Sequence, residues 1–576
     1  MTRVCIENSR RLTGANLFSM QTGAVLDLLA EDATLTNFKT AWENQASKLL
    51  SAIGWSQENT FHRLYEGGIS LGLTAPIDCL YSAAELAEAA VLLAGKELGV
   101  ENITGIELES ATGFDSLAQY LQELIVDEQN PALLKLAAAA ESNNVLFLFD
   151  DDLVSLGSGP TCQKWKVDEL PAVKDLVWSS YKTIPLALIT GTNGKSTSVR
   201  LASAIAEAAS MQVGSTSTDY IKVGNNIIDK GDYSGPGGAR TLLRDKRVEI
   251  AFLELARGGL LRRGLGVPEA DTALITNVAA DHLGDYGINS VAELRQAKFI
   301  VQKALKPTSP LVLNADDEGV VEFASNLKQN IIWFAENFNN QTLVNHLNDK
   351  GEAISVLEDD IVHFKAEKRT RIVNIKDIPL TLGGHARHNV QNVLGVCGIC
   401  CALGIGYEAI RQGLLGFRSD ATQNPGRGNF YEARGVKVLV DFAHNEHGMQ
   451  ALASTASSIT SKRRLILMGQ AGDRSDESII DMVNAAMQAQ PDHLIASETP
   501  GYERGREAHE TADVIAATAL ARGLSKDCIT RSNNPTEGIK KALDWAQAGD
   551  LLLLFVLTNR DESIRVVEDY VKSATD

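Results

Sequence analysis

Short apolar runs of strand length recur along the chain, separated by longer segments in which apolar positions repeat at helical spacing. In the middle of the chain these runs are 186–189, 249–254, 272–277 and 310–314. A helical segment at 290–304 and other loops and helices lie between them. Apolar strands that alternate with helices predict an α/β fold with a mostly parallel, doubly wound sheet. Ligands of such sheets bind at the carboxyl ends of the strands.

The same alternation starts again after about residue 421. Four further strand candidates are 437–441, 464–468, 493–497 and 551–557, and 535–548 is a helix candidate among them. No G-x-G-x-x-G fingerprint accompanies this pattern. It therefore predicts a second, Rossmann-like domain at the C-terminal end.

The first 150 residues carry mixed helical and strand patterns without a recognisable catalytic cluster. Helices are expected at 83–98 and 131–142, and a short buried strand at 144–149. Glycines and prolines make 157–185 irregular, which favours a linker. We therefore expect three domains: an N-terminal α/β accessory domain with linker (1–182), a central doubly wound domain (183–420) and the C-terminal domain (421–576).

Composition narrows the function classes. Of the 576 residues 44% are hydrophobic and 22% charged, and the net charge of −19 argues against nucleic acid or an anionic membrane as partner. No apolar run approaches the roughly 20 residues that span a bilayer, and residues 1–8 lack the apolar core of a signal peptide. The expectation is a cytoplasmic protein; a homo-oligomer stays open.

Three of the seven cysteines lie close together at Cys397, Cys400 and Cys401. They fall within an apolar helical run, and no second Cys or His pair stands at metal-ligand spacing from them. We interpret them as buried helix-packing thiols rather than metal ligands.

Residues 184–197 read Ile-Pro-Leu-Ala-Leu-Ile-Thr-Gly-Thr-Asn-Gly-Lys-Ser-Thr. A strand that runs into a glycine turn, a Lys-Ser pair and a helix from about residue 198 is the pattern of a phosphate-binding loop. Its backbone N–H groups and Lys195 would meet phosphates, and the Ser196 hydroxyl could hold Mg²⁺. One departure is Ile189, which stands where the usual spacing places the first glycine.

Polar residues follow two of the predicted central strands. Glu254 ends one strand, and Asn277, Asp281 and His282 follow the next. A lone buried carboxylate costs several kcal/mol unless it is paired or metal-bound. Together with the phosphate-binding loop, these residues predict a Mg²⁺ and triphosphate site; the alternative is that Asp281 caps a helix and His282 only packs.

Six ordered motifs resemble those of Mur ligases. They are Gly191–Thr197, Asn277 with Asp281-His282-Leu283, 314–317, 388–392, Gly426-Arg427 and Asp441-Phe-Ala-His444. The stretches 230–236, 254–262, 425–427, 441–448 and 472–476 are most similar to the Mur-like half of cyanophycin synthetase. Mur ligases have three domains and activate a carboxylate with ATP.

The resemblance implies a role for each matching residue. ATP and Mg²⁺ are the implied cofactors. The implied nucleotide contacts are Gly191, Thr192, Asn193, Gly194, Lys195, Ser196, Thr197, Asn277, Asn389, Asn392, Arg427 and Asp441. Ser196, Glu254, His282 and Lys298 are the implied metal ligands, and Lys195, Glu254, His282 and Lys298 the implied catalytic residues. The implied substrate contacts are Thr218, Arg257, His444, Gly472, Asp473 and Arg474.

Lys298 has two interpretations. Many Mur ligases carry a carbamylated lysine at about this place, which converts an ammonium group into an anionic metal ligand. The alternative is a solvated lysine on the surface of a helix.

The implied reaction joins an amino acid or amine to a carboxylate of a peptide-like acceptor through an acyl phosphate. The N-terminal domain (1–182) would be an accessory domain or would dock this acceptor. Residues 10–16 and 153–159 resemble the N-terminal part of cyanophycin synthetase and its junction with an ATP-grasp module. Only 32 positions separate Gly159 from Gly191, so no such module fits between them. A peptidoglycan-precursor or folylpolyglutamate-type ligase is the alternative enzyme; a nucleotide-gated binding module is the alternative of another class.

Overall fold

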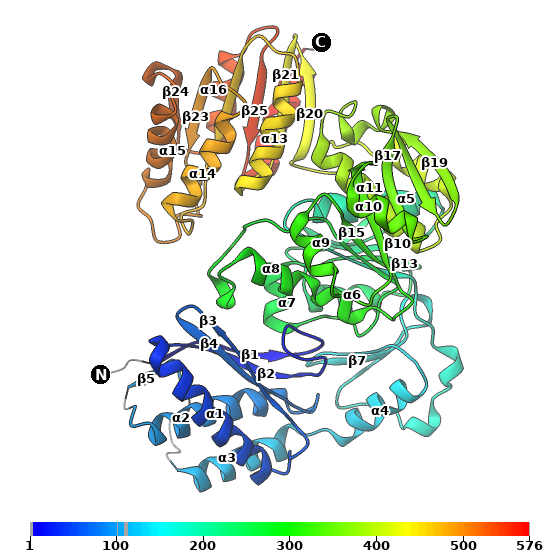
Figure 1. Ribbon diagram of the computed structural model, residues 1–576, viewed down its shortest axis with the longest axis vertical. Helices are drawn as coiled ribbons and strands as arrows, with labels where there is room; N and C mark the ends of the chain where they lie inside the picture. The colour runs from blue at the N-terminus through cyan, green and yellow to red at the C-terminus, as the bar shows by residue number, and fades with distance from the viewer. Residues whose placement is uncertain (1–3, 101, 107, 109–112, 575–576) are drawn as a thin grey trace.

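The computed structural model describes residues 4–100, 102–106, 108 and 113–574. Three regions follow one another along the longest axis, with the N-terminal region at the bottom of Figure 1 and the C-terminal region at the top. The central region lies between them and contacts both. Within the described chain, no helix combines the length and apolar character that a bilayer crossing requires.

The N-terminal region holds a five-stranded sheet in the order β3-β4-β2-β1-β5. Its strands are β1 (Val4–Leu12), β2 (Gly23–Leu29), β3 (Thr60–Tyr65), β4 (Gly68–Thr74) and β5 (Ile103–Thr104). Its helices are α1 (Asp32–Ala52), α2 (Leu80–Glu97) and α3 (Phe114–Glu128). These helices cover one face of the sheet and bury Phe38 and Trp42 against it. The expected α/β character of this region is confirmed.

A small three-stranded sheet, β6-β7-β8, follows with α4 (Pro131–Ser142) packed beside it. Its strands are β6 (Phe147–Phe149), β7 (Leu153–Leu156) and β8 (Gln163–Lys166). The segment 157–185 is irregular over most of its length, as predicted. It is nevertheless folded, because β8 pairs with β7 and Tyr181 is buried in the same apolar cluster. The segment 157–185 is therefore not a simple linker, because part of it packs with the three-stranded sheet.

The central region is built on an eleven-stranded sheet in the order β12-β11-β10-β13-β9-β14-β15-β16-β17-β18-β19. Its parallel strands are β10 (Val213–Thr216), β13 (Ile250–Glu254), β9 (Leu186–Thr190), β14 (Thr272–Ile275), β15 (Leu311–Asn314), β16 (Ile331–Asn337) and β17 (Glu352–Leu357). Antiparallel strands extend both edges: β11 (Tyr220–Val223), β12 (Asn226–Lys230), β18 (Asp360–Lys365) and β19 (Lys368–Asn374). The prediction of a mostly parallel sheet is confirmed.

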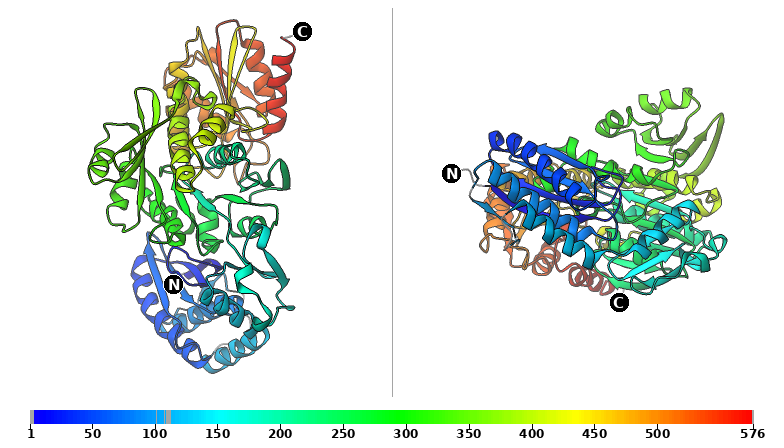
Figure 2. Two further views of the ribbon diagram at one scale, coloured as in Figure 1. Left: turned by 90° about the vertical axis from the view of Figure 1, so that its right-hand side faces the viewer. Right: turned by 90° about the horizontal axis from the view of Figure 1, so that it is seen from below.

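Helices cover both faces of this sheet (Figure 2). One face packs against α5 (Lys195–Ala208), α11 (Arg387–Ala402) and α12 (Tyr407–Gly416). The other packs against α6 (Pro236–Leu243), α7 (Arg257–Arg263), α8 (Val291–Lys298), α9 (Glu318–Ala324) and α10 (Gln341–Asn348). Residues of β9 alternate between the two apolar clusters, as a doubly wound sheet requires. The three clustered cysteines lie on α11, where Cys397 and Cys400 are buried, as expected of packing thiols.

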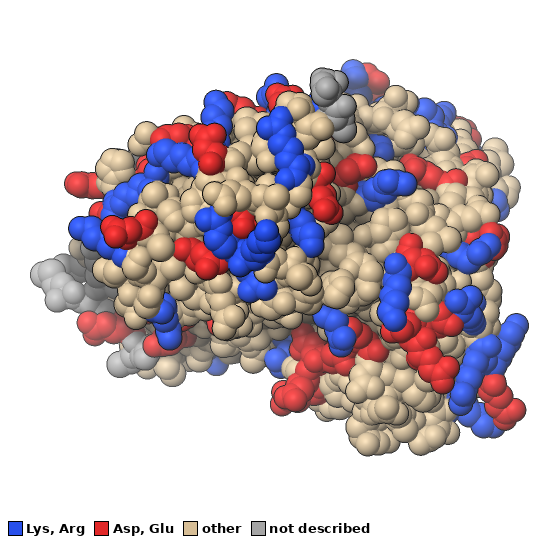
Figure 3. Space-filling model, turned by 90° about the horizontal axis from the view of Figure 1, so that it is seen from above, with Lys and Arg blue, Asp and Glu red and all other residues tan. Residues whose placement is uncertain are grey.

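The C-terminal region holds a six-stranded sheet in the order β20-β21-β25-β22-β23-β24. Its strands are β20 (Arg427–Ala433), β21 (Val436–Asp441), β22 (Arg464–Met468), β23 (His493–Ser497), β24 (Ile529–Ser532) and β25 (Leu551–Phe555). The helices are α13 (Glu446–Ser458), α14 (Asp476–Met487), α15 (Glu510–Ala521), α16 (Pro535–Trp545) and α17 (Arg560–Lys572). Five strands are parallel and β20 is an antiparallel edge, which confirms the Rossmann-like prediction. The face in Figure 3 carries Lys and Arg interspersed with Asp and Glu.

A buried ion pair stabilises the N-terminal sheet. Arg10 Nη1 on β1 lies 2.5 Å from Asp27 Oδ2 on β2, and Ser70 on β4 donates to the same carboxylate. Asp27 is fully buried. Removing one partner of a buried pair leaves the other charge uncompensated.

We therefore expect Asp27→Ala to lower the free energy of unfolding of this region by about 3–5 kcal/mol. The control is Asp151→Ala, because Asp151 pairs with Arg11 but is largely exposed, and such pairs contribute only about 0–1 kcal/mol. Urea-dependent hydrogen exchange of peptides from 4–100 measures both effects. Equal effects of the two substitutions would contradict the stabilising role of the buried pair of Arg10 and Asp27.

Candidate functional site

The phosphate-binding loop joins the buried strand β9 to α5, at the carboxyl edge of the central sheet. Gly191 (φ +148°) and Gly194 (φ +87°) adopt backbone conformations that side chains disfavour. The helix begins at Lys195, three residues earlier than predicted, because Gly194 already turns the chain into it. Lys195 Nζ donates to the carbonyls of Gly191 (3.0 Å) and Thr192 (2.9 Å). Burial lowers the pKa of Lys195.

Glu254 lies at the end of β13, next to the loop. Its side chain is only 1% exposed, and Ser196 Oγ donates to Oε1 at 3.2 Å. The other carboxylate oxygen, Oε2, is buried without a hydrogen-bond partner. Burial raises the pKa of Glu254 although Lys195 opposes this. The chain thus presents a free, buried carboxylate oxygen beside a serine hydroxyl, a donor set suited to a hard divalent cation.

Three predicted asparagines surround the loop. The Asn277 Oδ1 accepts from the backbone N–H of Asn193 at 3.0 Å. Asn392 lies so close to Gly194 that an added Cβ would stand 2.1 Å from its Oδ1. Asn392 in turn donates to Asn389 at 3.2 Å. The loop is therefore fixed from β14 and from α11. Thr192 bonds Ala279, and Thr197 is buried on α5 near Asn424.

Lys298 is the last residue of α8. The single helix predicted over 290–304 is in fact two elements, because after α8 the chain continues as a 3₁₀ helix, η5 (Phe299–Ala304). The side chain is 3% exposed, and Nζ donates to the Gly191 carbonyl at 2.8 Å. The interpretation as a solvated lysine is therefore wrong. Burial, followed by the nearby charge of Lys195, lowers the pKa of Lys298 well below its usual value.

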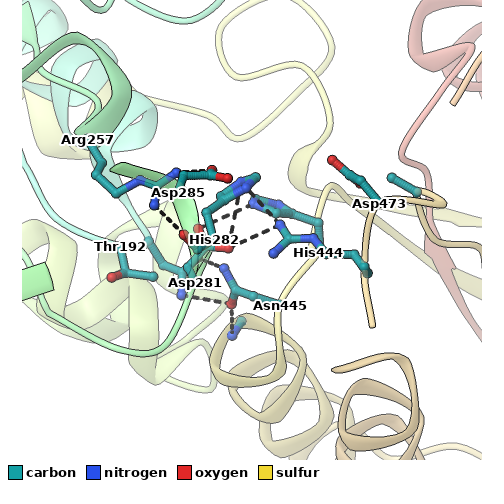
Figure 4. Close-up of polar contacts among 12 residues, drawn as sticks. Thr192, Arg257, Asp281, His282, Asp285, His444, Asn445 and Asp473 are labelled. Carbon is teal, nitrogen blue, oxygen red and sulfur yellow. Dashed lines mark hydrogen bonds and ion pairs between the residues drawn. The ribbon is translucent and has the colours of Figure 1, made fainter. Parts of the chain in front are cut away.

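Asp281 and His282 meet residues of the C-terminal region (Figure 4). The Nε2 atoms of His282 and His444 each lie 3.8 Å from an Asp281 oxygen. Arg474 Nη2 reaches both Asp281 Oδ1 (3.2 Å) and His282 Nε2 (3.1 Å). Burial lowers the pKa of His282 to about 4, so its imidazole is neutral at pH 7. Within the described part of the chain, Asp281, His282 and His444 are the group whose ligand atoms could share a metal ion.

The remaining predicted substrate residues occupy different parts of the same site. Arg257 donates to the His282 carbonyl and pairs with Asp285 at 2.6 Å. Thr218 presents a buried hydroxyl without a hydrogen-bond partner. Asp473 pairs with Arg504 and stands apart from the histidine cluster in Figure 4. Gly472 packs against the Glu503 carbonyl, which leaves no room for a side chain there.

Arg427 and Asp441 close the site from the C-terminal region. They are partners in the β20–β21 register, and the guanidinium of Arg427 lies 4.8 Å from the centre of the Phe442 ring. Burial raises the pKa of Asp441 to about 6, although Arg427 opposes this. The Arg427 Nε is buried without a hydrogen-bond partner. A ligand between the two regions would find donor and acceptor groups here.

One cavity of about 1360 Å³ brings nearly all these residues together. The predicted site residues that line this cavity are Thr192, Asn193, Gly194, Lys195, Ser196, Thr197, Thr218, Glu254, Arg257, Asn277, His282, Lys298, Asn389, Asn392, Arg427, Asp441, His444 and Asp473. Gly191, Gly472 and Arg474 are not among its lining residues. The volume exceeds that of an ordinary single-ligand pocket, about 300–1,000 Å³, and fits several reactants held side by side.

Sequence reasoning missed the contacts that join the central and C-terminal regions. Asn193 bonds Asn445 (3.2 Å) and the His447 Nδ1 atom (2.9 Å). Asp219 pairs with Arg560 at 2.9 Å, and Arg200 donates to Asn424 at 3.0 Å. His388, which belongs to the 388–392 motif but has no predicted role, lines the cavity with an unpartnered Nδ1. Asn445 and His447 stand within the 441–448 stretch, so that stretch was the available signal.

Comparisons with known proteins agree with this geometry. The family model described as "Mur ligase middle domain" matches 189–400, and "Mur ligase, glutamate ligase domain" matches 426–555. A cyanophycin synthetase of Geminocystis herdmanii is 36% identical over 389 residues, which cover 67% of this chain and 44% of that protein. The chain thus spans less than half the length of such curated relatives.

Two further proteins are more distant. The UDP-N-acetylmuramoyl-L-alanyl-D-glutamate–2,6-diaminopimelate ligase of Clostridium botulinum is 26% identical, over 73% of this chain and 83% of that protein. The structure of E. coli FolC in complex with ADP superposes with a TM-score of 0.50 at 16% identity, over 68% of this chain and 90% of that one. The latter shows a shared fold.

We expect Gly194→Ala to weaken ATP binding at least tenfold. The residue has a positive φ, and an added Cβ would collide with Asn392. Gly237→Ala is the control, because Gly237 lies on α6 with nothing within 4 Å of an added Cβ. Titration with a fluorescent ATP analogue measures both affinities. Unchanged affinity of the folded Gly194→Ala protein would contradict the placement of phosphates at this loop.

Proposed function

Because this chain belongs to the Mur ligase family, we propose that it is an ATP-dependent ligase that joins an amine to a carboxylate through an acyl phosphate. The observation that carries the proposal is the buried carboxylate of Glu254, with one oxygen free, directly beside Ser196 of the phosphate-binding loop. In a purely structural glutamate at this position, Oε2 would lose its solvation without gaining a hydrogen-bond partner.

The phosphate-binding loop and its surroundings bind the triphosphate. The first residues of α5 and the loop residues Thr192, Asn193 and Gly194 line the cavity, and Lys195 would supply a point charge to the β- and γ-phosphates. Asn389, Asn392, Arg427 and Asp441 extend the nucleotide site toward the C-terminal region. Transfer of a phosphoryl group needs positioned charge more than a protein nucleophile, and these residues provide it.

A divalent cation, which we propose to be Mg²⁺, fits the residues present. Ser196 and Glu254 would hold it, and His282 and Lys298 would serve a second ion. Bound there, the cation supplies positive charge to phosphoryl oxygens as negative charge develops on them. The structure of E. coli FolC is described as "in complex with ADP", a nucleotide ligand of that protein.

The reaction has two steps. An oxygen of the acceptor carboxylate attacks the γ-phosphorus of ATP, and the bond to ADP breaks. The amine nitrogen then attacks the acyl carbon, loses a proton, and expels inorganic phosphate. We place the acceptor at Thr218 and Arg257, and the amine at His444, Asp473 and Arg474. Except for Arg474, these residues line the same cavity as the phosphate-binding loop. The geometry therefore allows one amine to approach one activated carboxylate.

We propose a peptide-like acceptor, as the similarity to cyanophycin synthetases suggests. Peptidoglycan precursors and folates remain the alternative acceptors, since the diaminopimelate ligase and FolC have related sequences or folds. We also propose domain boundaries near residues 182 and 420, because a separate sheet lies on each side of both positions.

We expect this chain to form one kind of amide bond. A backbone peptide and a side-chain amide would need acceptor sites of two different shapes, and a single cavity would have to provide both. The test supplies ATP, Mg²⁺, aspartate and arginine, with or without a short acidic peptide; parallel arms use a muramyl peptide and a folate. Phosphate release and product masses are measured. A single mass increment on one acceptor supports the proposal. Polymer growing by both linkages would overturn the single-linkage expectation, and ATP binding without turnover in any arm would favour a binding module.

Lys195→Ala is expected to lower the rate of ATP turnover by at least 10²-fold, while the protein still folds. The lysine acts as a point charge on phosphates, so its loss affects chemistry more than core packing. Phosphate release and a urea denaturation curve are compared with the wild type. A cooperatively folded variant with wild-type phosphate release would refute the role of the loop.

Lys298 is expected to carry a carbamate. Its amine is buried and its pKa is lowered, which increases the fraction of the neutral form that reacts with CO₂. Intact-mass spectra in bicarbonate should show an added 44 Da, and Lys298→Ala should lose most activity and regain part of it with short carboxylic acids. Free amine alone, together with full activity of Lys298→Ala in bicarbonate-free buffer, would exclude the modification.

A further inference from the structure

The segment 282–287, on the side of the cavity where we place the acceptor, has an unusual backbone. His282 (φ +48°), Gly284 (φ +104°), Tyr286 (φ +55°) and Gly287 (φ +63°) all adopt positive φ angles. Non-glycine residues in such conformations need support from their surroundings. The segment itself supplies few bonds, such as Gly284 N to the Ile288 carbonyl at 2.9 Å. External contacts must therefore hold its shape.

One support comes from within the central region and the other from the N-terminal region. Arg257 donates to the His282 carbonyl and pairs with Asp285. Arg63, on β3 of the N-terminal sheet, donates through Nη2 to the carbonyls of Tyr286 and Gly287, both at 2.9 Å. These bonds reach across more than 220 positions of the chain. The fork of an arginine suits two neighbouring carbonyls, which a lysine would not satisfy equally.

Neighbouring residues of the N-terminal sheet pack against the same segment. The Arg10 guanidinium lies 5.0 Å from the centre of the Tyr286 ring. Gly287 rests on the Tyr65 ring so closely that an added Cβ would stand 2.5 Å from it. Figure 1 shows the N-terminal strands directly below α7 and α8. The segment is thus clamped between the N-terminal sheet and the cavity, which Asp285 and Tyr286 line.

Arg63 also fixes the start of α8. Its Nη1 lies 3.0 Å from Glu293 Oε1, and the other oxygen of Glu293 accepts from the backbone N–H and hydroxyl of Ser290. This capping box begins the helix that ends at Lys298, whose Nζ contacts the Gly191 carbonyl. A continuous set of contacts therefore leads from β3 to the phosphate-binding loop.

We propose that Arg63 is a positioning residue for the acceptor: through the 282–287 segment it holds Arg257 in the geometry that receives the acceptor carboxylate, and through α8 it holds Lys298 at the phosphate-binding loop. The N-terminal region then completes one wall of the active site. This inference rests on the proposed ligase activity and adds a role for a residue far from the chemistry. A displacement of about 1 Å at the reacting atoms can cost 10²-fold in rate, so such a support has consequences for turnover.

The kinetic test compares Arg63→Gln and Arg63→Lys with Arg11→Gln. Arg11 is a matched control, since it is an N-terminal arginine of similar exposure (14% against 16%) whose side chain pairs with Asp151 instead. We expect Arg63→Gln to raise the KM of the acceptor about tenfold or more, with the KM values of ATP and amine within about twofold of wild type. Arg63→Lys should recover only part of this loss. A merely structural role would lower the active fraction and leave all KM values unchanged.

Hydrogen–deuterium exchange of the substrate-free protein gives a readout that needs no activity. Arg63→Gln should speed exchange in peptides covering 282–293 at least tenfold, whereas Arg11→Gln should not. Unchanged exchange there, or an unchanged acceptor KM in an active variant, would overturn the inference. If instead the wild type shows no acceptor-dependent turnover, the proposed function fails, while the exchange experiment still decides whether Arg63 holds the segment.

Discussion

The buried carboxylate of Glu254 is the constraint on which the site depends. It sits at the end of a fully buried strand, where burial alone would favour its neutral form. Lys195 and Ser196 offset part of this cost, and one oxygen is left to bind a cation. The glycine turn must bring Lys195 and Ser196 to the end of the strand that carries Glu254. The positive φ angles of Gly191 and Gly194 allow the chain to turn in this way.

The cavity also depends on contacts between regions. Asn193 with Asn445, Asp281 with Arg474, and Asp219 with Arg560 connect the central and C-terminal regions around the nucleotide site. On the opposite side, the N-terminal sheet supports the segment that carries Asp285. The two charged pairs, Asp281 with Arg474 and Asp219 with Arg560, are strengthened where water is excluded.

Local signals in the sequence predicted the fold well. The strand at 186–189 and its glycine turn are adjacent in the chain, and parallel-sheet strands read as continuous apolar runs, so the central and C-terminal sheets could be foreseen. The strand-end residues Glu254 and His282 followed from topology. Contacts such as Arg63 with Glu293, Asn193 with Asn445 and Asp219 with Arg560 join positions 230, 252 and 341 residues apart. No periodicity or motif encodes which arginine meets which carboxylate at such separations.

The acyl phosphate is the central claim, and oxygen transfer tests it most directly. The acceptor that best supports phosphate release would be labelled with ¹⁸O in its carboxylate, and the released phosphate analysed by mass spectrometry. An acyl phosphate places one acceptor oxygen in each phosphate, because the acyl C–O bond breaks when the amine attacks. The account predicts phosphate that carries one ¹⁸O for each amide formed. Unlabelled phosphate alongside amide product, or label in AMP, would contradict it.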